Sequence, residues 1–447
     1  MFPMFKDLKV PNLVTLSIGC DGLSVSRSSN RQIWPILCKV DQSTKTLPFV
    51  IAIFYGVSKP NSLEEFLSDF VSELKSVHEN GILVGGNLYT IRISFFAADA
   101  PARSFLKSCA MFNAYFGCEK CNVEGDYRDR VVFLNCNCIL RTDESFRSRR
   151  DEEHHKDISP LESVGIGMVT QFPLDFMHLV CLGVVRKMLY ALIKGPLRVR
   201  LASQQVKKIN QKLEQIKSLI PNEFARKCRT LDALKHFKAT EFRLFVLYVG
   251  PFALQNEIRT DLFKHFLLLH TGIFILATKS ASQKTPNDIA QKLLVQFVTE
   301  CRKLYGAEFL SYNVHSLIHL AGDCLNFGSL DDFSCFPFEN HLQFFRRRLR
   351  SRRCHAQQIV NRITEQEEVE LTCSSVRDSN GYVERSNYDK YRYNGYLLSR
   401  LSGNNCFLLN SNKVVIITSL AAMSTNLIEC RVFDSLRKHD EYPVDST

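Results

Sequence analysis

Two histidines and a glutamate stand out between residues 311 and 340, in the stretch SYNVHSLIHLAGDCLNFGSLDDFSCFPFEN. His315 and His319 are four residues apart, so on a helix both imidazoles leave the same face of one turn. The pair lacks the H-E-x-x-H pattern of a zinc protease, because Ser316 and Leu317 follow the first histidine. The pair is therefore either half of a metal site or two satisfied core histidines.

Two cysteines in the stretch GCEKC have the spacing of a zinc half-site. Cys118 and Cys121 form a C-x-x-C motif, in which two thiolates hold one ion from a tight turn. The same spacing also serves redox pairs. Cys136 and Cys138 in NCNC could compete as ligands, but a C-x-C pair is a poorer chelate, and we interpret both as structural. Together with the two histidines, the C-x-x-C pair completes four ligands for a closed, structural zinc site.

Three acidic residues in separate segments are of the type that binds magnesium or manganese. Asp21 in CDGLS lies at a strand end, Asp99 in FFAADAP follows an apolar strand, and Glu339 lies in FPFENHLQFF. Hard cations prefer oxygen ligands, and phosphoryl transfer on a nucleic acid can use two such ions to align the attacking oxygen and stabilise the leaving one. Each acid taken singly could be a helix cap or a surface acid, which is the commoner case for any one of them.

A run of arginines follows the glutamate and predicts contact with phosphate. The stretch FFRRRLRSRRCH holds Arg346, Arg347, Arg348, Arg350, Arg352 and Arg353. A helix this basic would repel itself unless it met phosphate, although a nuclear-localisation patch or a solvated face has the same composition. The net charge of +11 and the pI near 8.9 also suit a polyanionic partner.

Hydrophobic alternation in the first hundred residues predicts the elements that must position the acids. The predicted elements are strands at 15–25, 33–41 and 47–56, a helix at 61–81 and a strand at 89–100. Ser62 and Glu65 form a capping box for the helix, and Gly81 ends it. This order is the opening order of an RNase H-like fold, in which Asp21 and Asp99 would follow two strands that lie side by side.

The rest of the chain is predicted to be a helical insertion and a return to the core. Helical spacing dominates from about 100 to 340, a long basic helix follows over 338–371, and the tail is β-rich. We therefore expect an α/β fold: an RNase H-like core interrupted by a large α-helical insertion, with a structural zinc site and a small β-rich C-terminal appendage. The expected parts are the first part of the core at 1–110, the zinc-pair loop and helical insertion at 111–310, the histidine pair, closing glutamate and basic helix at 311–389, and the C-terminal region at 390–447.

Composition excludes several classes of protein. The 447 residues, 45% hydrophobic and 23% charged, are ordinary for a soluble globular protein. The apolar runs FRLFVLYVGPFAL and HFLLLHTGIFILA are interrupted and too short to span a bilayer, and MFPMFKDLKV lacks the pattern of a secretory signal. Sixteen cysteines in an apparently intracellular chain predict reduced thiols and metal ligands rather than disulfides.

With these motifs assembled, the chain resembles the DDE transposases of the CACTA (En/Spm) group and their domesticated relatives. DGLSVSRSSNRQIWPIL is similar to the family's first-Asp block, FYGVSKP to its next block, and ADAPARSFL with CEKC to its second-Asp and cysteine-pair region. FPLDFMHLVCLGVVRKML resembles its Asp-x-Met-His segment, and residues 311–347 resemble its Tyr-x-x-His-x-x-x-His block and closing Phe-Glu. The likeness covers roughly residues 15–370. More distantly, the catalytic subunit of the V(D)J recombinase orders its parts in the same way.

The resemblance implies a role for each motif. The implied catalytic metal ligands are Asp21, Asp99 and Glu339, and the implied zinc ligands are Cys118, Cys121, His315 and His319. The zinc would pin the insertion to the core and place the glutamate-bearing helix beside the two aspartates. Asp175 is an alternative third acid, but we favour Glu339 because the arginines that would meet DNA follow it.

The chain departs from the family in two places. Plant members carry an acid soon after Met-His, whereas Val180 stands here. Full-length transposases usually carry an N-terminal DNA-binding region, and none is recognisable in the 20 residues before Asp21. We therefore expect a fragment, a decayed copy or a host-recruited domain.

The expected function is that of a DDE-type DNA transposase, which cleaves DNA with water and joins the freed 3′-hydroxyl to target DNA. Such an enzyme would use two Mg²⁺ or Mn²⁺ ions and one structural Zn²⁺. It would act on transposon ends and target DNA in the nucleus, as a homodimer assembled on DNA and without a membrane partner. The alternative is a catalytically inactive, transposase-derived DNA-binding or scaffold protein. A zinc-dependent hydrolase is disfavoured, since four protein ligands leave no open position for water.

Overall fold

A computed structural model gives the fold of most of the chain. The described residues are 12–24, 31–42, 47–348, 354–373, 390–393, 396–399, 403–409, 413–420 and 428–433. The chain divides into two compact units, each assembled from separate segments. The first unit consists of Met1–Val180, Ile275–Gln291 and Gly306–Arg377, and the second of Cys181–Phe274, Lys292–Tyr305 and Asp378–Thr447.

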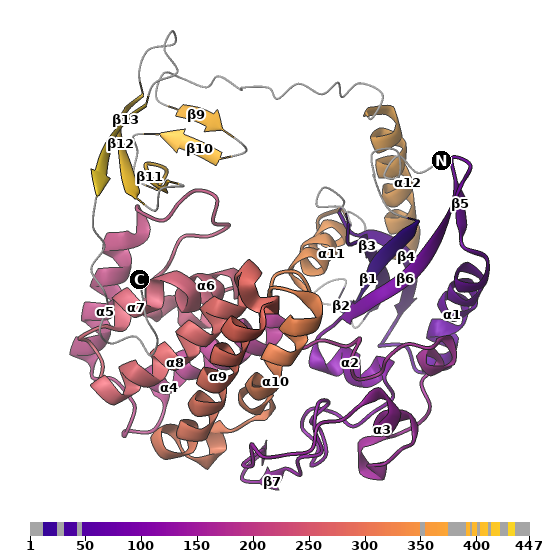
Figure 1. The fold of residues 1–447 in the computed structure, drawn as a ribbon, viewed down its shortest axis with the longest axis horizontal. Coiled ribbons are helices and arrows are strands. Elements are labelled where there is room, and N and C mark those ends of the chain that lie inside the picture. The colour runs from indigo at the N-terminus through magenta and orange to yellow at the C-terminus, as the bar shows by residue number, and fades with distance from the viewer. Residues whose placement is uncertain are drawn as a thin grey trace. The chain divides into compact units, whose positions relative to one another are not determined.

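Within its described residues, the first unit contains a mixed sheet of six strands, drawn in indigo and purple in Figure 1. The strands are β1 (Leu13–Cys20), β2 (Leu23–Ser24), β3 (Gln32–Val40), β4 (Phe49–Gly56), β5 (Ile82–Val84) and β6 (Asn87–Ala97). β3 lies antiparallel to both β1 and β4, and β6 lies parallel to β1 and antiparallel to β5. The long strands therefore run across the sheet in the order β4, β3, β1, β6.

Helix α1 (Leu63–Asn80) connects β4 to the β5–β6 pair and packs against β6. Ser62 caps the helix by accepting a hydrogen bond from the Glu65 amide, and Gly81, at φ +66°, follows its last residue, as the sequence predicted. The buried face joins the core beneath β1, β3 and β6, and consists of Leu67, Phe70, Val71 and Leu74. Because β1 and β6 are parallel, the carboxyl ends of both strands reach the same edge of the sheet.

Most of the remaining elements of the first unit come from a cysteine-bearing loop and from the return of the chain after residue 305. The loop segment contains α2 (Ala100–Leu106), the hairpin β7 (Asp126–Tyr127) and β8 (Val131–Val132), and α3 (Asp143–Arg147). The returning segment contains α10 (Tyr312–Phe327), α11 (Phe336–Arg348) and α12 (His355–Cys373). The core-forming segments are thus far apart in sequence, as an interrupted fold requires.

The prediction of one long basic helix over 338–371 is wrong, because the structure has two helices there. α11 ends at Arg348 and α12 begins at His355. Cys354, directly before α12, has φ +51°, which is a left-handed conformation that an α-helix does not continue through. Side-chain periodicity and charge do not reveal a break of this kind.

The second unit is largely helical in its described part, and strands follow near its C-terminal end. Its helices are α4 (Arg186–Lys194), α5 (Ser203–Lys217), α6 (Ala239–Leu244), α7 (Gly250–Leu254), most of α8 (Thr260–Leu276) and the end of α9 (Lys284–Tyr305). Its strands are β9 (Lys390–Tyr393), β10 (Tyr396–Ser399), β11 (Cys406–Leu408), β12 (Val414–Leu420) and β13 (Ile428–Phe433). The chain is therefore a mixed α/β protein with a large helical part and a β-rich C-terminal part.

One apolar helical stretch in the described part has the length and composition needed to cross a membrane. It spans Phe176–Lys194, and 61% of this window is buried within the protein. The first ten residues of the stretch form a π-helix, Phe176–Val185. A mostly buried core helix of a soluble protein has the same length and composition, so the stretch is weak evidence for a membrane span.

Candidate functional site

Asp21 follows β1 and Asp99 follows β6, and the two aspartates lie at equivalent positions beyond the ends of these neighbouring parallel strands. In the pairing of β1 with β6, Gly19 lies opposite Ala97, and each aspartate comes two residues later. Asp99 also caps α2, because its carboxylate accepts a hydrogen bond of 2.8 Å from the Ala102 amide. The parallel register therefore brings the two aspartates to one edge of the sheet, as the sequence predicted.

Glu339 reaches the same place from the first turn of α11. Its neighbour Phe338 packs directly on β1, where a methyl group added to Gly19 would lie 2.3 Å from the ring atom Cδ1. Leu342 and Phe345 continue the buried face of the helix. A glycine in β1 thus allows α11 to approach the strand closely enough to place Glu339 beside Asp21.

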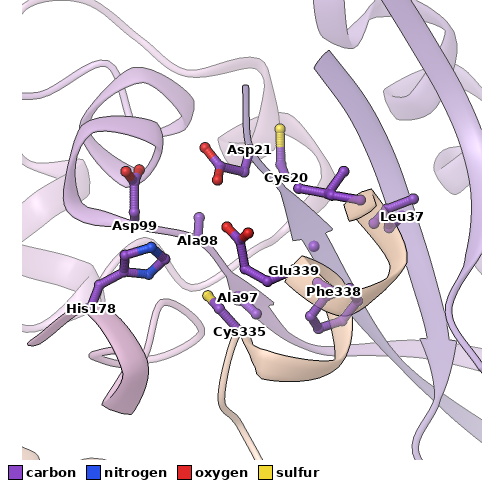
Figure 2. A pocket seen from close by; sticks show the side chains of 12 residues that line it. Cys20, Asp21, Leu37, Ala97, Ala98, Asp99, His178, Cys335, Phe338 and Glu339 are labelled. Atoms are coloured by element: carbon purple, nitrogen blue, oxygen red, sulfur yellow. The ribbon is translucent and has the colours of Figure 1, made fainter. Parts of the chain in front are cut away.

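The three acids line one small pocket, which we call the acid pocket. Its other lining residues are Gly19, Cys20, Leu37, Ala97, Ala98, His178, Cys335, Phe338 and Leu342. Figure 2 shows the carboxylates of Asp21 and Glu339 facing one another, with Asp99 and His178 across the pocket. The structure therefore brings together the three acids that the sequence singled out, and their catalytic roles stay predictions.

Burial and the crowding of these acids raise the pKa of Asp21 to about 8. Burial is the largest cause, followed by a hydrogen bond with Glu339 and by the charges of Asp99 and Glu339, while the Gly22 amide acts in the opposite direction. Like charges in a poorly solvated pocket favour the binding of a proton or a cation. Carboxylate oxygens are the ligands that Mg²⁺ and Mn²⁺ prefer, so the donor set of the pocket fits a divalent ion.

His178 is a pocket residue to which the sequence reasoning gave no role. Its Nδ1 lies 2.7 Å from Oδ2 of Asp175, and its backbone amide donates to the same oxygen at 2.7 Å. Burial lowers the pKa of His178, but the hydrogen bond to Asp175 and the charge of Asp175 raise it. The charges of Asp99 and Glu339 add to this effect, and the pKa reaches about 9. The Asp-x-Met-His pattern was the available signal, but nothing in it shows where the imidazole points.

Asp175, the alternative third acid, is committed to other groups. It is only 2% exposed, and its Oδ1 accepts hydrogen bonds from the Cys335 amide at 2.7 Å and from the Ser334 hydroxyl at 3.4 Å. Its Oδ2 accepts from His178, and although burial raises its pKa, that bond holds the pKa below the ordinary value. Asp175 is not among the residues that line the acid pocket, whereas Glu339 is.

The predicted zinc ligands converge in a second, buried site of the first unit. The cluster consists of Cys118, Cys121, His315 and His319. The two Sγ atoms are 3.4 Å apart, Cys118 Sγ lies 3.6 Å from His319 Nε2, and Cys121 Sγ lies 3.3 Å from His315 Nε2. In a tetrahedral zinc site, bonds of about 2.0 Å to nitrogen and 2.3 Å to sulfur separate the ligands by about 3.3–3.8 Å. The cluster could therefore hold a metal ion such as zinc.

The two thiols of the cluster differ in protonation, because the hydrogen bond with Cys118 raises the pKa of Cys121 above its ordinary value. Burial raises the pKa of the Cys118 thiol, but the hydrogen bond from Cys121 and the charge of His319 hold it well below its ordinary value. The thiolate is the form of cysteine that binds metal. Four protein ligands fill a tetrahedral shell, which is typical of a structural zinc site and not of a catalytic one.

Glu119, inside the C-x-x-C turn, links the cluster to the acid pocket. Its carboxylate is 1% exposed and lies 3.0 Å from Arg103 Nε, 3.2 Å from Lys107 Nζ and 2.8 Å from the Tyr312 hydroxyl. Burial raises the pKa of Glu119, but these two cations lower it to about 2. Arg103 also donates to the carbonyl of Ala98, directly before the second aspartate of the pocket, at 2.7 Å. The cysteine turn therefore anchors the end of β6.

Lys120, the other residue inside the turn, provides a second link. Its Nζ lies 2.7 Å from Oδ1 of Asp323 on α10 and donates to the Val169 carbonyl at 3.0 Å. The other oxygen of Asp323 accepts from the Leu174 amide at 2.8 Å, directly before Asp175. Glu119 and Lys120, the two residues between Cys118 and Cys121, thus hold the segments that carry Asp99 and Asp175.

The two remaining cysteines of this region lie in the same loop. Cys136 and Cys138 are half-buried and do not belong to the four-residue cluster. A hydrogen bond with Cys121 lowers the pKa of the Cys138 thiol, although burial acts against it. Cys138 is therefore a neighbour of the cluster, and four other ligands already complete a tetrahedral set.

The predicted DNA-binding arginines are described only in part. Arg346, Arg347 and Arg348 lie in the last turn of α11, and the side chain of Arg347 is exposed. The side chains of Arg346 and Arg348, and the whole of Arg350, Arg352 and Arg353, lie outside the described part of the chain. The acid pocket and the first three arginines of the run, Arg346, Arg347 and Arg348, therefore lie at opposite ends of α11.

Comparisons of the chain with known protein families and with curated proteins gave no match. What the acid pocket does is inferred from its own residues and from the order of the motifs.

Proposed function

We propose that the chain is a DDE-type DNA transposase, or a strand-transferase derived from one, that cleaves and joins DNA in the acid pocket. One observation carries this proposal: Asp21, Asp99 and Glu339 come from three separated segments and line the same pocket. A structural role would not need three acids to share a poorly solvated space, because such crowding opposes folding. A site that binds divalent cations for phosphoryl transfer does need them.

The arrangement of the strands supports an RNase H-like core. Three antiparallel strands, a helix and a fourth strand parallel to the first produce the order β4, β3, β1, β6. In a fold of this kind the first and fourth strands are neighbours, and their ends carry the first two acids. We propose the RNase H-like assignment on this order and on the positions of Asp21 and Asp99.

Each group of the pocket has a separate task in the proposed reaction. When bound, two divalent cations activate the attacking oxygen and stabilise the leaving oxygen of the scissile phosphate. The carboxylates of Asp21, Asp99 and Glu339 hold these cations, and the register of β1 against β6 sets the spacing of the first two. The cysteine–histidine cluster holds a zinc ion that keeps α10 against the cysteine turn, so that α11 delivers Glu339.

The arginines that follow Glu339 supply the contact with the DNA backbone. A helix that begins with a metal ligand and ends with cations can bind a phosphate backbone while its first turn reaches the scissile phosphate. Transposition acts on two DNA ends, so we propose a homodimer assembled on DNA, with the protein working in the nucleus.

A nicking assay tests the proposal. The purified zinc-containing chain is incubated with supercoiled plasmid and a mixture of duplex oligonucleotides in the presence of Mn²⁺, and nicked and joined products are quantified. We expect nicking by the wild type and a loss of at least about 100-fold in Asp99→Asn and Glu339→Gln, since each variant removes a cation ligand.

A matched control separates loss of chemistry from loss of charge. Asp288→Asn removes an exposed acid on α9, and this variant should nick DNA at the wild-type rate. A wild-type chain that binds DNA but never nicks any substrate would overturn the enzyme proposal and leave an inactive DNA-binding or scaffold protein. Nicking that survives in Asp99→Asn would place the chemistry elsewhere.

A further inference from the structure

His178 has a fixed orientation at the edge of the acid pocket. One ring nitrogen, Nδ1, and the backbone amide of the same residue both bond to Oδ2 of Asp175, each at 2.7 Å. The side chain of His178 is 27% exposed and that of Asp175 is 1% exposed. Figure 2 shows the imidazole pointing into the pocket, toward the carboxylates of Asp99 and Glu339. The nitrogen that does not meet Asp175, Nε2, is thus the one available to a ligand in the pocket.

The partner of this imidazole is itself held rigidly. Oδ1 of Asp175 accepts from the Cys335 amide and the Ser334 hydroxyl, so both of its oxygens are engaged. In metal sites a ligating histidine almost always donates its second ring N–H to a carboxylate or a carbonyl, which fixes the tautomer and the ring orientation. Asp175 and His178 have this relationship, and the free nitrogen faces two further ligands of the kind that bind divalent cations.

We propose that His178 is a metal ligand of the acid pocket through Nε2, and that Asp175 is the residue that positions it. The cation site would then combine carboxylate oxygens with one imidazole nitrogen. The inference rests on the proposed metal-dependent function, and it names the class of cation that the pocket takes: a first-row transition ion such as Mn²⁺ in preference to Mg²⁺.

The preference follows from the chemistry of the ligands. Mg²⁺ demands nearly ideal octahedral oxygen coordination and loses its water reluctantly. Transition ions accept imidazole nitrogen more readily and tolerate mixed nitrogen and oxygen shells. Cys335 also lines the pocket, and its ligand atom lies within 4.8 Å of those of Asp175 and His178.

Pulsed electron paramagnetic resonance on the full, zinc-containing chain tests the inference. Mn²⁺ is the probe, and the spin-echo modulation of the bound ion reports nitrogen atoms in direct coordination. We expect the ¹⁴N modulation of one coordinated imidazole in the wild type and its loss in His178→Gln. The same variant should bind Mn²⁺ at least about tenfold more weakly, with a much smaller change for Mg²⁺.

Three further variants complete the design. The Asp99→Asn variant locates the ion: if Mn²⁺ binds in the acid pocket, the affinity of this variant for Mn²⁺ should fall. Asp175→Asn should weaken Mn²⁺ binding by about tenfold while the zinc content stays constant, as expected of a positioning residue. His236→Gln, an exposed histidine of the second unit, should change neither the modulation nor the affinity.

The outcomes separate this inference from the proposed function. Mn²⁺ that binds in an Asp99-dependent way without ¹⁴N modulation overturns the role of His178, and Mn²⁺-dependent nicking would still support the transposase proposal. Modulation in a wild-type chain that never nicks DNA keeps His178 as a ligand and overturns the transposase proposal. The modulation itself is read from the wild type, and an unchanged zinc content shows that the variants used to assign it are folded. A chain with no Asp99-dependent Mn²⁺ binding would contradict both.

Discussion

At the scale of single residues, the acids that meet in the acid pocket oppose the stability of the fold. Asp21 has a pKa of about 8 because burial and its acidic neighbours oppose its charged form. At neutral and higher pH this residue therefore lowers the free energy of unfolding unless a cation is bound. Residues at functional sites often reduce the free energy of unfolding in this way, and interactions elsewhere in the fold offset the loss.

The first prediction concerns Asp21→Asn. The folded-state pKa is raised from 3.8 to about 8, so the group's contribution to stability is fully present below about pH 4 and is lost as the pH rises toward 8. At about pH 9, without added Mg²⁺ or Mn²⁺, the free energy of unfolding of the variant should therefore exceed that of the wild type by at least roughly 1 kcal/mol. Its melting temperature should be higher accordingly. At about pH 5 this advantage should disappear.

Thermal denaturation of the zinc-containing chain, without a chelator, measures this difference. Added Mn²⁺ should stabilise the wild type and not the variant, since a ligand that binds only the folded state raises the melting temperature. Asp288→Asn serves as the control, with equal melting temperatures expected at both pH values. If the variant melts below the wild type at high pH without Mn²⁺, then burial and the neighbouring acids do not destabilise the charged form of Asp21.

At the scale of elements, the site depends on the packing of one helix against one strand. α11 lies so close to β1 that the ring of Phe338 occupies the space where a side chain at position 19 would begin. This contact sets the position of Glu339, the next residue along the helix. The glycine is needed for space and not for backbone freedom, because its φ is not positive.

The second prediction is that Gly19→Ala weakens the site more than it weakens the fold. The added methyl group must push away an aromatic ring that cannot bend, which costs about 1–3 kcal/mol for overpacking. The shift of α11 should reduce Asp99-dependent Mn²⁺ binding and nicking by at least about tenfold, because catalytic geometry tolerates little displacement. Mn²⁺ titration and the nicking assay measure both effects.

A partner variant tests the cause of this effect. Phe338→Leu in the Gly19→Ala background removes part of the ring and should restore some Mn²⁺ affinity. Gly322→Ala on α10 is the matched control, because a methyl group there meets nothing within 4 Å. Equal losses in both glycine variants would show that the close approach of α11 to β1 has no special role.

At the scale of the whole molecule, the first unit is joined from segments that are distant in sequence. Cys118 and His319 are 201 residues apart, and Lys120 and Asp323 are 203 apart. The cysteine–histidine cluster, the Tyr312 hydroxyl that donates to Glu119 and the buried ion pair of Lys120 connect the same two segments. A cross-link between distant segments contributes strongly to folding, because it restricts the unfolded chain, and zinc binding is coupled to folding in the same way.

The third prediction is that removal of zinc destabilises the chain and impairs the acid pocket. The His315→Ala, His319→Ala double variant should lose one zinc per chain and melt at least roughly 5 °C lower. Zinc content by elemental analysis and thermal denaturation measure these effects. His265→Gln, a buried histidine of the second unit outside the cluster, should keep its zinc. A well-folded wild type without zinc would show that the two histidines are core residues.

The sequence by itself determined the local elements and the types of ligand. Strands at β1, β3, β4 and β6 follow from short alternating patterns, and α1 follows from an apolar stripe with a Ser62 cap and a terminal Gly81. The Cys118 and His315 pairs could be recognised because chelation requires ligands at fixed short spacing. These features depend on interactions within a few residues, so the order of amino acids encodes them directly.

Only the tertiary structure decided which distant residues meet. It placed Glu339 rather than Asp175 in the acid pocket, directed His178 into the same pocket and divided the predicted basic helix at Cys354. It also buried Glu119 and Lys120 as links between the two sites. The physical reason is that packing between segments some 200 residues apart depends on side-chain shape, such as the absence of one at Gly19, and no local pattern in the sequence records that fit.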